Sequence, residues 1–420
     1  MKKMKSNWIA LVLVVSLSAL LLIACGSRDD AGKGAAGSGG TGGTGGTTTE
    51  FEMADLGGGW SIFGVSSGGA NEGTIYGILD LNTSGLVLNG GYGHSDGVSS
   101  ADFDILGGTF TIDEDDGVLG GTADTDLPST ITVASGKMNA SKNVFTFVAS
   151  TDAGEENMFV AIKNVITGGE EYEDDDLDEL WYLFGASSGG TNEGYIRGWI
   201  SMDDEPGEGE EDIEGVIPVL GGAFTHSDGT ITGITGGDIT ISTGGRLSGT
   251  ATTNNVTPIT ITYGKMNLAK DALSMYATDA MDNYMLVAIK QVGEDAFTES
   301  DLEGTWYISG SSSGGADGTI RGTIILEAGD TGIANVTGGS YIHSDGTVAT
   351  LTGGIFPING EGLLSSGNET PFITTDTPFT ITVIQGKMNN AKDVISYVAN
   401  TTAGGLEMVF AVKGDTILQP

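Results

Sequence analysis

The sequence has a single cysteine, Cys25, among its 420 residues. No disulfide can form within the chain, so its folded parts must be held together by their hydrophobic cores. Proline is also scarce, with 8 residues, whereas glycine is abundant, with 71. After the N-terminal segment, no window of 11 residues has the apolar spacing of an amphipathic helix, and alternation with a period of two is widespread. These features exclude a helical protein and predict strands.

Basic residues are also few. The chain has 17 Lys and Arg but 56 Asp and Glu, which gives a net charge of −39. A field of this sign repels nucleic acid and anionic lipid, and it favours solubility and loosely bound cations. The chain has only three histidines, and it contains no Gly-x-Ser-x-Gly motif and no cysteine nucleophile. We therefore predict that the protein is not an enzyme and needs no cofactor.

The N-terminal segment has the parts of an export signal. Lysines at positions 2, 3 and 5 are followed by an apolar run of 16 residues, 8–23. This run is short for a transmembrane helix, which needs ~20 residues. It ends at Leu22-Ile23-Ala24-Cys25, which resembles the lipobox of bacterial lipoproteins, where the cysteine is lipidated and becomes the new N-terminus.

The resemblance implies a signal peptide over 1–24, lipidation of Cys25 and attachment to a membrane of the cell envelope. Gly26-Ser27 does not look like the aspartate-type signal for retention in the inner membrane, which implies the outer membrane, on its periplasmic or its surface side. A non-lipidated signal peptide or a permanent anchor is the alternative. Residues 25–50 are rich in Gly and Thr and form a flexible tether, with a root-mean-square reach of roughly 25–30 Å.

The remainder consists of three copies of one unit, which we place at 51–167, 168–293 and 294–420. An opening phrase with Asp-Leu, Trp and Ser-Ser-Gly-Gly occupies 55–69, 176–190 and 301–315. A closing phrase, Gly-Lys-Met-Asn, occupies 136–139, 264–267 and 386–389. The opening tryptophans, Trp60, Trp181 and Trp306, are 121 and 125 residues apart. This spacing is the length of a small domain rather than of one turn of a solenoid.

Within each copy, alternate positions after the Ser-Ser-Gly-Gly turn are apolar or glycine. They are Ile75, Gly77, Leu79 and Leu81; Ile196, Gly198, Ile200 and Met202; and Ile320, Gly322, Ile324 and Leu326. One apolar face and one mixed face are typical of an antiparallel sheet with one solvated side. We expect an all-β protein with eight strands per copy, joined by short turns in an antiparallel meander. Such a meander buries its apolar face by closing into an up-and-down barrel; a β-sandwich is the alternative.

Gly304-Thr305-Trp306-Tyr307 resembles the G-x-W opening of lipocalins and avidin-like barrels. The first copy keeps Gly58 and Trp60, whereas the second has Glu179 in place of the glycine. The resemblance implies that Trp60, Trp181 and Trp306 anchor the core by plugging one end of each barrel. Two acidic linkers join the copies, at 170–179 and 294–303. Like charges within each linker repel one another, so we expect extended linkers and three separate copies, like beads on a string, with limited mutual contact.

Candidate sites are few. His94, His226 and His343 each precede Ser-Asp-Gly, and we interpret them as turn residues; a weak metal contact is the alternative, although zinc needs three or four ligands. Gly-Lys-Met-Asn lacks the context of a phosphate-binding loop, so it is interpreted as a strand end with an apolar Met and a turn-forming Asn. The acidic run 113–117 is interpreted as a solvated turn rather than a calcium loop. No metal site is predicted.

These observations favour a lipid-anchored cell-envelope protein with a binding or structural role. Three copies raise the effective local concentration for a repeated target such as a glycan or a matrix polymer. The alternative is a lipocalin-like carrier of small apolar ligands, which needs a connected interior cavity of about 300 Å³ or more.

The anchor is testable by substitution. Because only a cysteine thiol accepts the lipid, Cys25→Ser should move the protein from the membrane fraction to the soluble fraction. Unchanged partitioning in a membrane fractionation experiment would count against lipid anchoring.

Overall fold

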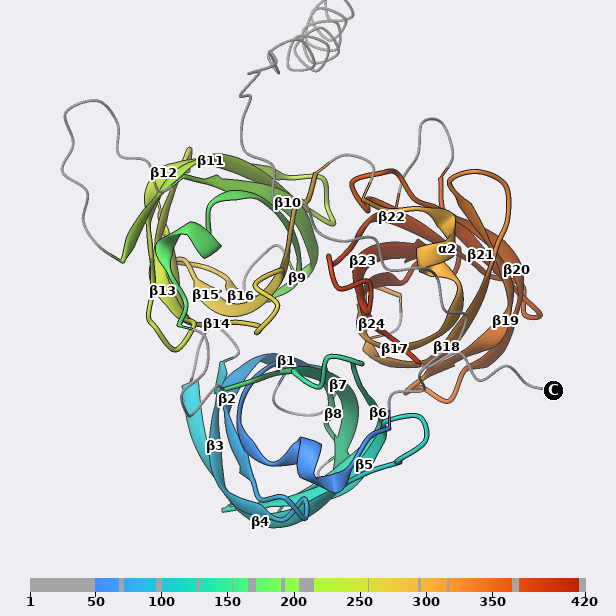
Figure 1. Ribbon diagram of the computed structural model, residues 1–420, viewed down its shortest axis with the longest axis horizontal. Coiled ribbons are helices and arrows are strands. Elements are labelled where there is room, and N and C mark those ends of the chain that lie inside the picture. The colour runs from blue at the N-terminus through green and yellow to red at the C-terminus, as the bar shows by residue number, and fades with distance from the viewer. Residues whose placement is uncertain are drawn as a thin grey trace, which may run out of the picture. The chain divides into compact units, whose positions relative to one another are not determined.

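The computed structural model describes residues 50–67, 72–95, 100–126, 129–152, 154–164, 171–189, 193–203, 215–255, 257–293, 296–315, 317–364 and 370–414. The predicted signal peptide, Cys25 and almost all of the tether lie outside the described residues. These residues form three closed antiparallel barrels of eight strands, in which consecutive strands are neighbours and the first pairs with the last (Figure 1). The prediction of three all-β up-and-down barrels is confirmed, and the sandwich alternative is wrong.

Each barrel begins with a short helix that precedes its first strand. The first barrel comprises η2 (Met53–Leu56), β1 (Gly58–Ser67), β2 (Gly73–Leu81), β3 (Val87–Ser95), β4 (Ser100–Ile112), β5 (Val118–Thr125), β6 (Thr130–Met138), β7 (Val144–Thr151) and β8 (Glu156–Lys163). The second comprises η3 (Asp174–Asp176), β9 (Glu179–Ser188), β10 (Gly194–Met202), β11 (Val216–His226), β12 (Ile231–Ile241), β13 (Arg246–Thr253), β14 (Ile259–Met266), β15 (Ala272–Thr278) and β16 (Asn283–Lys290). The third comprises α2 (Glu299–Leu302), β17 (Gly304–Ser313), β18 (Gly318–Ala328), β19 (Ile333–His343), β20 (Val348–Pro357), β21 (Phe372–Thr375), β22 (Thr380–Met388), β23 (Val394–Thr401) and β24 (Leu406–Lys413).

The three tryptophans lie in the three barrel cores, with exposed fractions of 0–1%. Each indole donates a hydrogen bond to a backbone carbonyl oxygen of the short helix region: Trp60 to Leu56, Trp181 to Leu177 and Trp306 to Leu302, at 2.7–2.8 Å. The buried N–H group is thereby satisfied, as a buried indole requires. These bonds fix the short helices to the strands that follow them.

The acidic linkers are not simply extended spacers. Residues 171–179 include η3, and 296–303 include α2; Leu177 and Leu302 of these segments are completely buried. The repulsion expected from the sequence is offset locally, because Asp176 accepts a hydrogen bond from the Glu173 N–H group and pairs with Lys270. The second copy also contains an acidic segment at 204–214, which lies outside the described residues.

Glu179 occupies the place of a glycine. Its φ is 102°, close to the 117° and 124° of Gly58 and Gly304 at the equivalent positions of the other copies. A side chain rarely adopts this conformation, whereas glycine adopts it without a steric cost. The backbone of the opening strand is therefore the same in all three copies, and the second copy adopts it with local strain.

The barrels are not separate beads. A cluster of outward-facing apolar residues, which we call the shared cluster, draws on all three copies. Its buried members are Phe63, Val65, Val144, Met158, Val160, Ile162, Phe184, Ala186, Tyr195, Tyr276, Met285, Val287, Val394, Val398, Met408, Phe410 and Val412. The expectation of limited mutual contact is therefore wrong.

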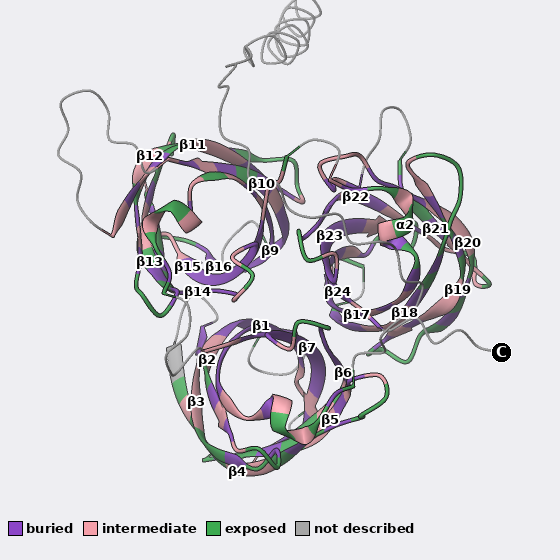
Figure 2. Ribbon diagram, in the orientation of Figure 1, coloured by how far each residue is buried: buried purple, intermediate pink, exposed green. Residues whose placement is uncertain are grey.

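The reason lies in strands that are buried on both faces. β1, β8, β16 and β24 each contain six or more consecutive buried residues, whereas β13 is a mixture of buried, intermediate and exposed positions (Figure 2). A strand that is buried on both faces has a continuous run of apolar residues in its sequence. The inner face of these strands belongs to a barrel core, and the outer face belongs to the shared cluster.

Among the described residues, no helix is long and apolar enough to cross a membrane.

The shared cluster predicts how a single truncation affects stability. Phe184→Ala should lower the free energy of unfolding by about 3–5 kcal/mol, because it removes a fully buried ring. Leu220→Ala is the matched control on the same barrel, where the side chain is 59% exposed, and it should change stability by less than about 0.5 kcal/mol. Chemical denaturation measures both values; equally small effects would contradict the shared cluster.

Candidate functional site

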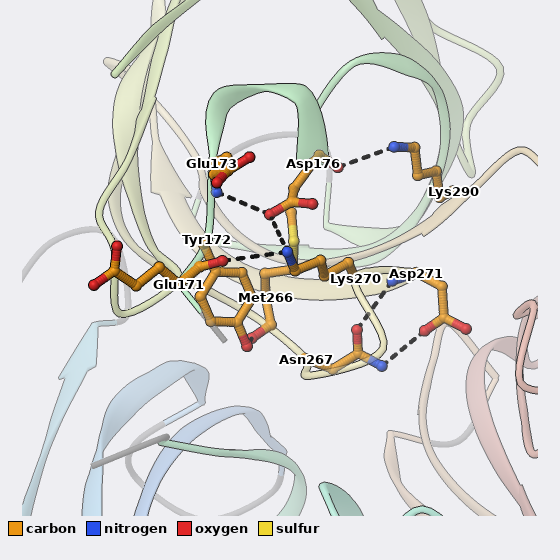
Figure 3. A network of polar contacts seen from close by, with 9 residues as sticks. All are labelled: Glu171, Tyr172, Glu173, Asp176, Met266, Asn267, Lys270, Asp271 and Lys290. Atoms are coloured by element: carbon orange, nitrogen blue, oxygen red, sulfur yellow. Dashed lines mark hydrogen bonds and ion pairs between the residues drawn. The ribbon is translucent and has the colours of Figure 1, made fainter. Parts of the chain in front are cut away.

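The end of each barrel that carries the short helix is held by a repeated ion-pair network, which Figure 3 shows for the second barrel. In the second barrel, the Asp176 carboxylate pairs with Lys270 at 2.8 Å, and Lys290 donates to the Asp176 backbone carbonyl at 3.0 Å. The other copies repeat this arrangement. The matching pairs are Lys142–Asp55 and Lys163–Asp55 in the first barrel, and Lys392–Asp301 and Lys413–Asp301 in the third. Because the three copies agree, we assign this end a structural role.

Gly-Lys-Met-Asn also serves the fold. Its methionine is completely buried in each barrel core, and Asn139 accepts the N–H groups of Asn143 and Val144 to close the following turn. Its lysine is buried as well, which alternation alone does not reveal. Lys137 lies 5.0 Å from the Tyr307 ring of the third barrel, and Lys387 lies 5.5 Å from the Tyr182 ring of the second. These lysines lie at junctions between barrels.

The turns after Gly-Lys-Met-Asn meet one another. Asn139 and Ser141 of the first barrel donate to the Asp393 carboxylate of the third, at 3.0 and 2.9 Å. The Ala391 N–H group of the third barrel donates to Asp271 of the second, at 2.9 Å. Burial raises the pKa of Asp271. Asp393 and Asp271 therefore fix the relative positions of the barrels by hydrogen bonds.

The interior of the second barrel is too full for a carrier of drug-sized ligands. In the second barrel the interior cavity has a volume of about 40 Å³ and is lined by Trp181, Leu183, Ile200, Phe224 and other apolar side chains. A pocket for a drug-sized apolar ligand of the kind that a carrier holds needs ~300 Å³ or more. The filled interior of the second barrel leaves no room there for the connected cavity that a lipocalin-like carrier needs.

A cavity with polar and apolar walls lies where serines of the three Ser-Ser-Gly-Gly phrases come together. It has a volume of about 350 Å³. Its walls are Val65, Ser66, Ser67, Glu72, Gly73, Ala186, Ser187, Ser188, Gly189, Glu193, Gly194, Tyr195, Ser311, Ser312, Ser313, Gly314, Asp317, Leu406 and Met408. All three copies contribute to it, so we call it the shared cavity. The repeated phrase draws attention to these serines, but the sequence does not show that the serines of the three copies line one cavity.

The histidines lie at the mouths of the barrels, at the ends of β3, β11 and β19. His94, His226 and His343 are only 8%, 3% and 4% exposed, and the turns after His226 and His343 are closed by backbone hydrogen bonds. Among the described residues, no group of three or more His, Cys, Asp or Glu side chains is placed to hold a metal ion. In the acidic run, Asp116 instead accepts a hydrogen bond from Tyr307 of the third barrel.

The three mouths differ in their side chains. Alignment on Met158, Met285 and Met408 gives Tyr92, His94 and Asn157 in the first; Phe224, His226 and Tyr284 in the second; and Tyr341, His343 and Glu407 in the third. Only the third therefore has a carboxyl group at the last position. Glu407 is 1% exposed and accepts a hydrogen bond from the Tyr341 hydroxyl at 2.8 Å. Burial raises its pKa to about 7. Comparison of the copies reveals this site, but alternation within one copy does not.

No protein-family model and no curated protein sequence matches this chain. Among solved structures, the redesigned β barrel mFAP1, bound to DFHBI, is 14% identical and covers 29% of this chain and 100% of its own, with a TM-score of 0.24. A mutant of the vaccine antigen Transferrin Binding Protein B from Haemophilus parasuis Hp5 is 8% identical and covers 84% of this chain and 76% of its own, with a TM-score of 0.28. At these identities and scores, the comparisons carry no functional assignment.

Glu407 should make the stability of the fold depend on pH. Its pKa is about 7 in the folded protein and lower in the unfolded chain, so its contribution is fully present at low pH and is lost as the pH rises through 7. From pH 5 to pH 8, the free energy of unfolding of the wild-type protein should fall by about 2–3 kcal/mol relative to that of Glu407→Gln. Denaturant titrations across this range test the difference, and parallel pH curves for the two proteins would contradict it.

Proposed function

We propose that this protein is a lipid-anchored binding protein of the cell envelope, without catalytic activity, and that its ligand occupies the shared cavity. One observation carries the proposal: all three copies contribute polar side chains to a single cavity of about 350 Å³. A purely structural role gives no reason for the paired serines of all three copies to line one cavity. Cys25 supplies the membrane anchor.

The walls of the cavity indicate the chemistry of the ligand. Serine hydroxyls can donate and accept hydrogen bonds, and the carboxylates accept them. Glu72, Glu193 and Asp317 occupy equivalent positions in the three copies, each directly before a glycine that opens the second strand of its barrel. Tyr195 adds an aromatic surface. This combination suits a hydroxylated ligand that carries amino groups, such as an amino-sugar glycan.

The net charge of the protein narrows the class of glycan further. A chain with a net charge of −39 repels polyanionic glycans and attracts cationic ones. We therefore expect one glycan segment per protein, in contact with all three copies, rather than three independent sites that act by avidity.

Calorimetric titration with a tetrasaccharide of glucosamine tests this proposal. We expect one ligand per chain, and Ser67→Leu, Ser188→Leu and Ser313→Leu should each weaken binding tenfold or more, a loss of about 1.4 kcal/mol or greater. Each substitution places an apolar group against the same ligand. Ser248→Leu, on an exposed position of the second barrel, is the control and should leave affinity unchanged.

Two results would overturn the proposal. A stoichiometry of three, reduced to two by any one of the serine variants, would show independent sites. Stronger binding of a hyaluronan oligosaccharide than of the glucosamine tetrasaccharide would show that the cavity does not select for positive charge.

A further inference from the structure

We propose that the mouth of the third barrel is a second binding site, for a small organic ammonium ion, and that Glu407 is the counter-ion. This site goes beyond the proposed function, because it lies within one barrel and selects a small molecule. The mouth contains a cavity of about 150 Å³, whose walls include Tyr341, His343, Phe379 and Glu407. This volume fits a molecule of amino-acid size.

The first argument is a missing counter-charge. No lysine or arginine is present among the described residues that line the cavity, and no ion pair of Glu407 occurs among the described residues. Its described hydrogen-bond partner is the neutral Tyr341 hydroxyl. A buried carboxylate is costly without a cation. A ligand ammonium group can supply that cation.

The second argument is the aromatic wall. The rings of Tyr341 and Phe379 are 5.4 Å apart and inclined at 65° to each other. Both line the cavity, and a ring face attracts an organic cation. The cavity therefore offers a carboxyl group and aromatic surfaces to the same charged group.

The third argument is an unsatisfied histidine atom. His343 Nδ1 contacts Asp345 twice: it lies 3.1 Å from the backbone nitrogen and 3.0 Å from the carboxylate, so Nδ1 is occupied within the turn. Nε2 is buried and has no hydrogen-bond partner among the described residues. Buried polar atoms normally have partners. A ligand that bears a hydroxyl group besides its ammonium group would satisfy this atom.

The other two mouths lack this combination. Asn157 replaces Glu407 in the first barrel and carries no charge. Tyr284 replaces it in the second barrel, where its hydroxyl donates to Asp279 at 2.9 Å. We therefore expect one ammonium ion per chain.

Binding should depend on pH. Burial raises the pKa of Glu407 to about 7, and the titratable groups that face it are Tyr341 on β19, Tyr397 on β23, and His343 and Asp345 beside the cavity. The two tyrosines remain neutral in this range because burial raises their pKa values further. Ionisation of Glu407 between pH 6 and pH 8 should therefore increase the affinity for a cation about tenfold.

Calorimetry with the full chain tests the site with two matched probes. Tyramine carries an ammonium and a hydroxyl group, and tyrosol replaces the ammonium group with a second hydroxyl. We expect tyramine to bind at pH 8 with one molecule per chain, at least tenfold more tightly than tyrosol, and about tenfold more weakly at pH 6. Equal affinities of the two probes for the wild-type protein would overturn the proposal without recourse to any variant.

Substitutions then locate the site. Glu407→Gln should remove both the preference for tyramine and the pH dependence, whereas Glu303→Gln, which removes an exposed charge beside the helix-bearing end of the same barrel, should remove neither. Phe379→Leu should weaken tyramine binding several-fold while the fold is retained. Unchanged tyramine binding by Glu407→Gln would overturn the proposal. Ser67→Leu in the first barrel should leave tyramine binding intact, so this test is independent of the shared cavity.

Discussion

The apolar outer faces of a few strands in each barrel impose the constraint on which the rest of the structure depends. A closed barrel satisfies its own backbone hydrogen bonds and fills its own interior, so an isolated one needs no neighbour. Here β1, β8 and their counterparts present Phe63, Phe184, Phe410 and similar side chains outward. Exposure of an apolar patch of this kind favours association. The three repeats meet this requirement within one chain by covering one another.

This packing explains why charged groups are buried at the junctions. Lys387 is 0% exposed and Asp271 is 3% exposed, yet each faces a neighbouring barrel. A buried charge is tolerated when hydrogen bonds or aromatic faces replace water. The Lys387 ammonium group donates to the Glu361 carbonyl, and its pKa falls to about 8 because of burial. A different arrangement of the barrels would remove the Tyr182 ring from Lys387 and the Ala391 N–H group from Asp271, so these contacts favour one arrangement.

The barrels could be predicted from the sequence because the alternation of apolar residues marks the strand face that points inward. Ile75, Leu79 and their counterparts identify the core directly. The outer face was missed for a physical reason: Val160-Ala161-Ile162 is equally apolar on both sides, and alternation cannot show a face that has no polar partner. The acidic linkers were wrongly predicted to be extended spacers for a related reason. The charge of a linker alone does not include the lysines that pair with it from turns distant in the sequence. Lys270 adopts a left-handed conformation, with φ 58°, where glycine is usual, and its side chain pairs with Asp176. Neither fact follows from local sequence.

The candidate sites divide along the barrel axis. At one end, a tryptophan, a leucine and an Asp–Lys pair recur in all three copies, because each barrel must be closed in the same way. At the other end, the position of Glu407 varies among Asn157, Tyr284 and Glu407, although the surrounding backbone is equivalent. A residue required for closure could not vary in this way without loss of the fold. The mouths are therefore the part of each barrel in which side chains can change to suit a ligand, while the closed ends and the shared cluster keep the scaffold constant.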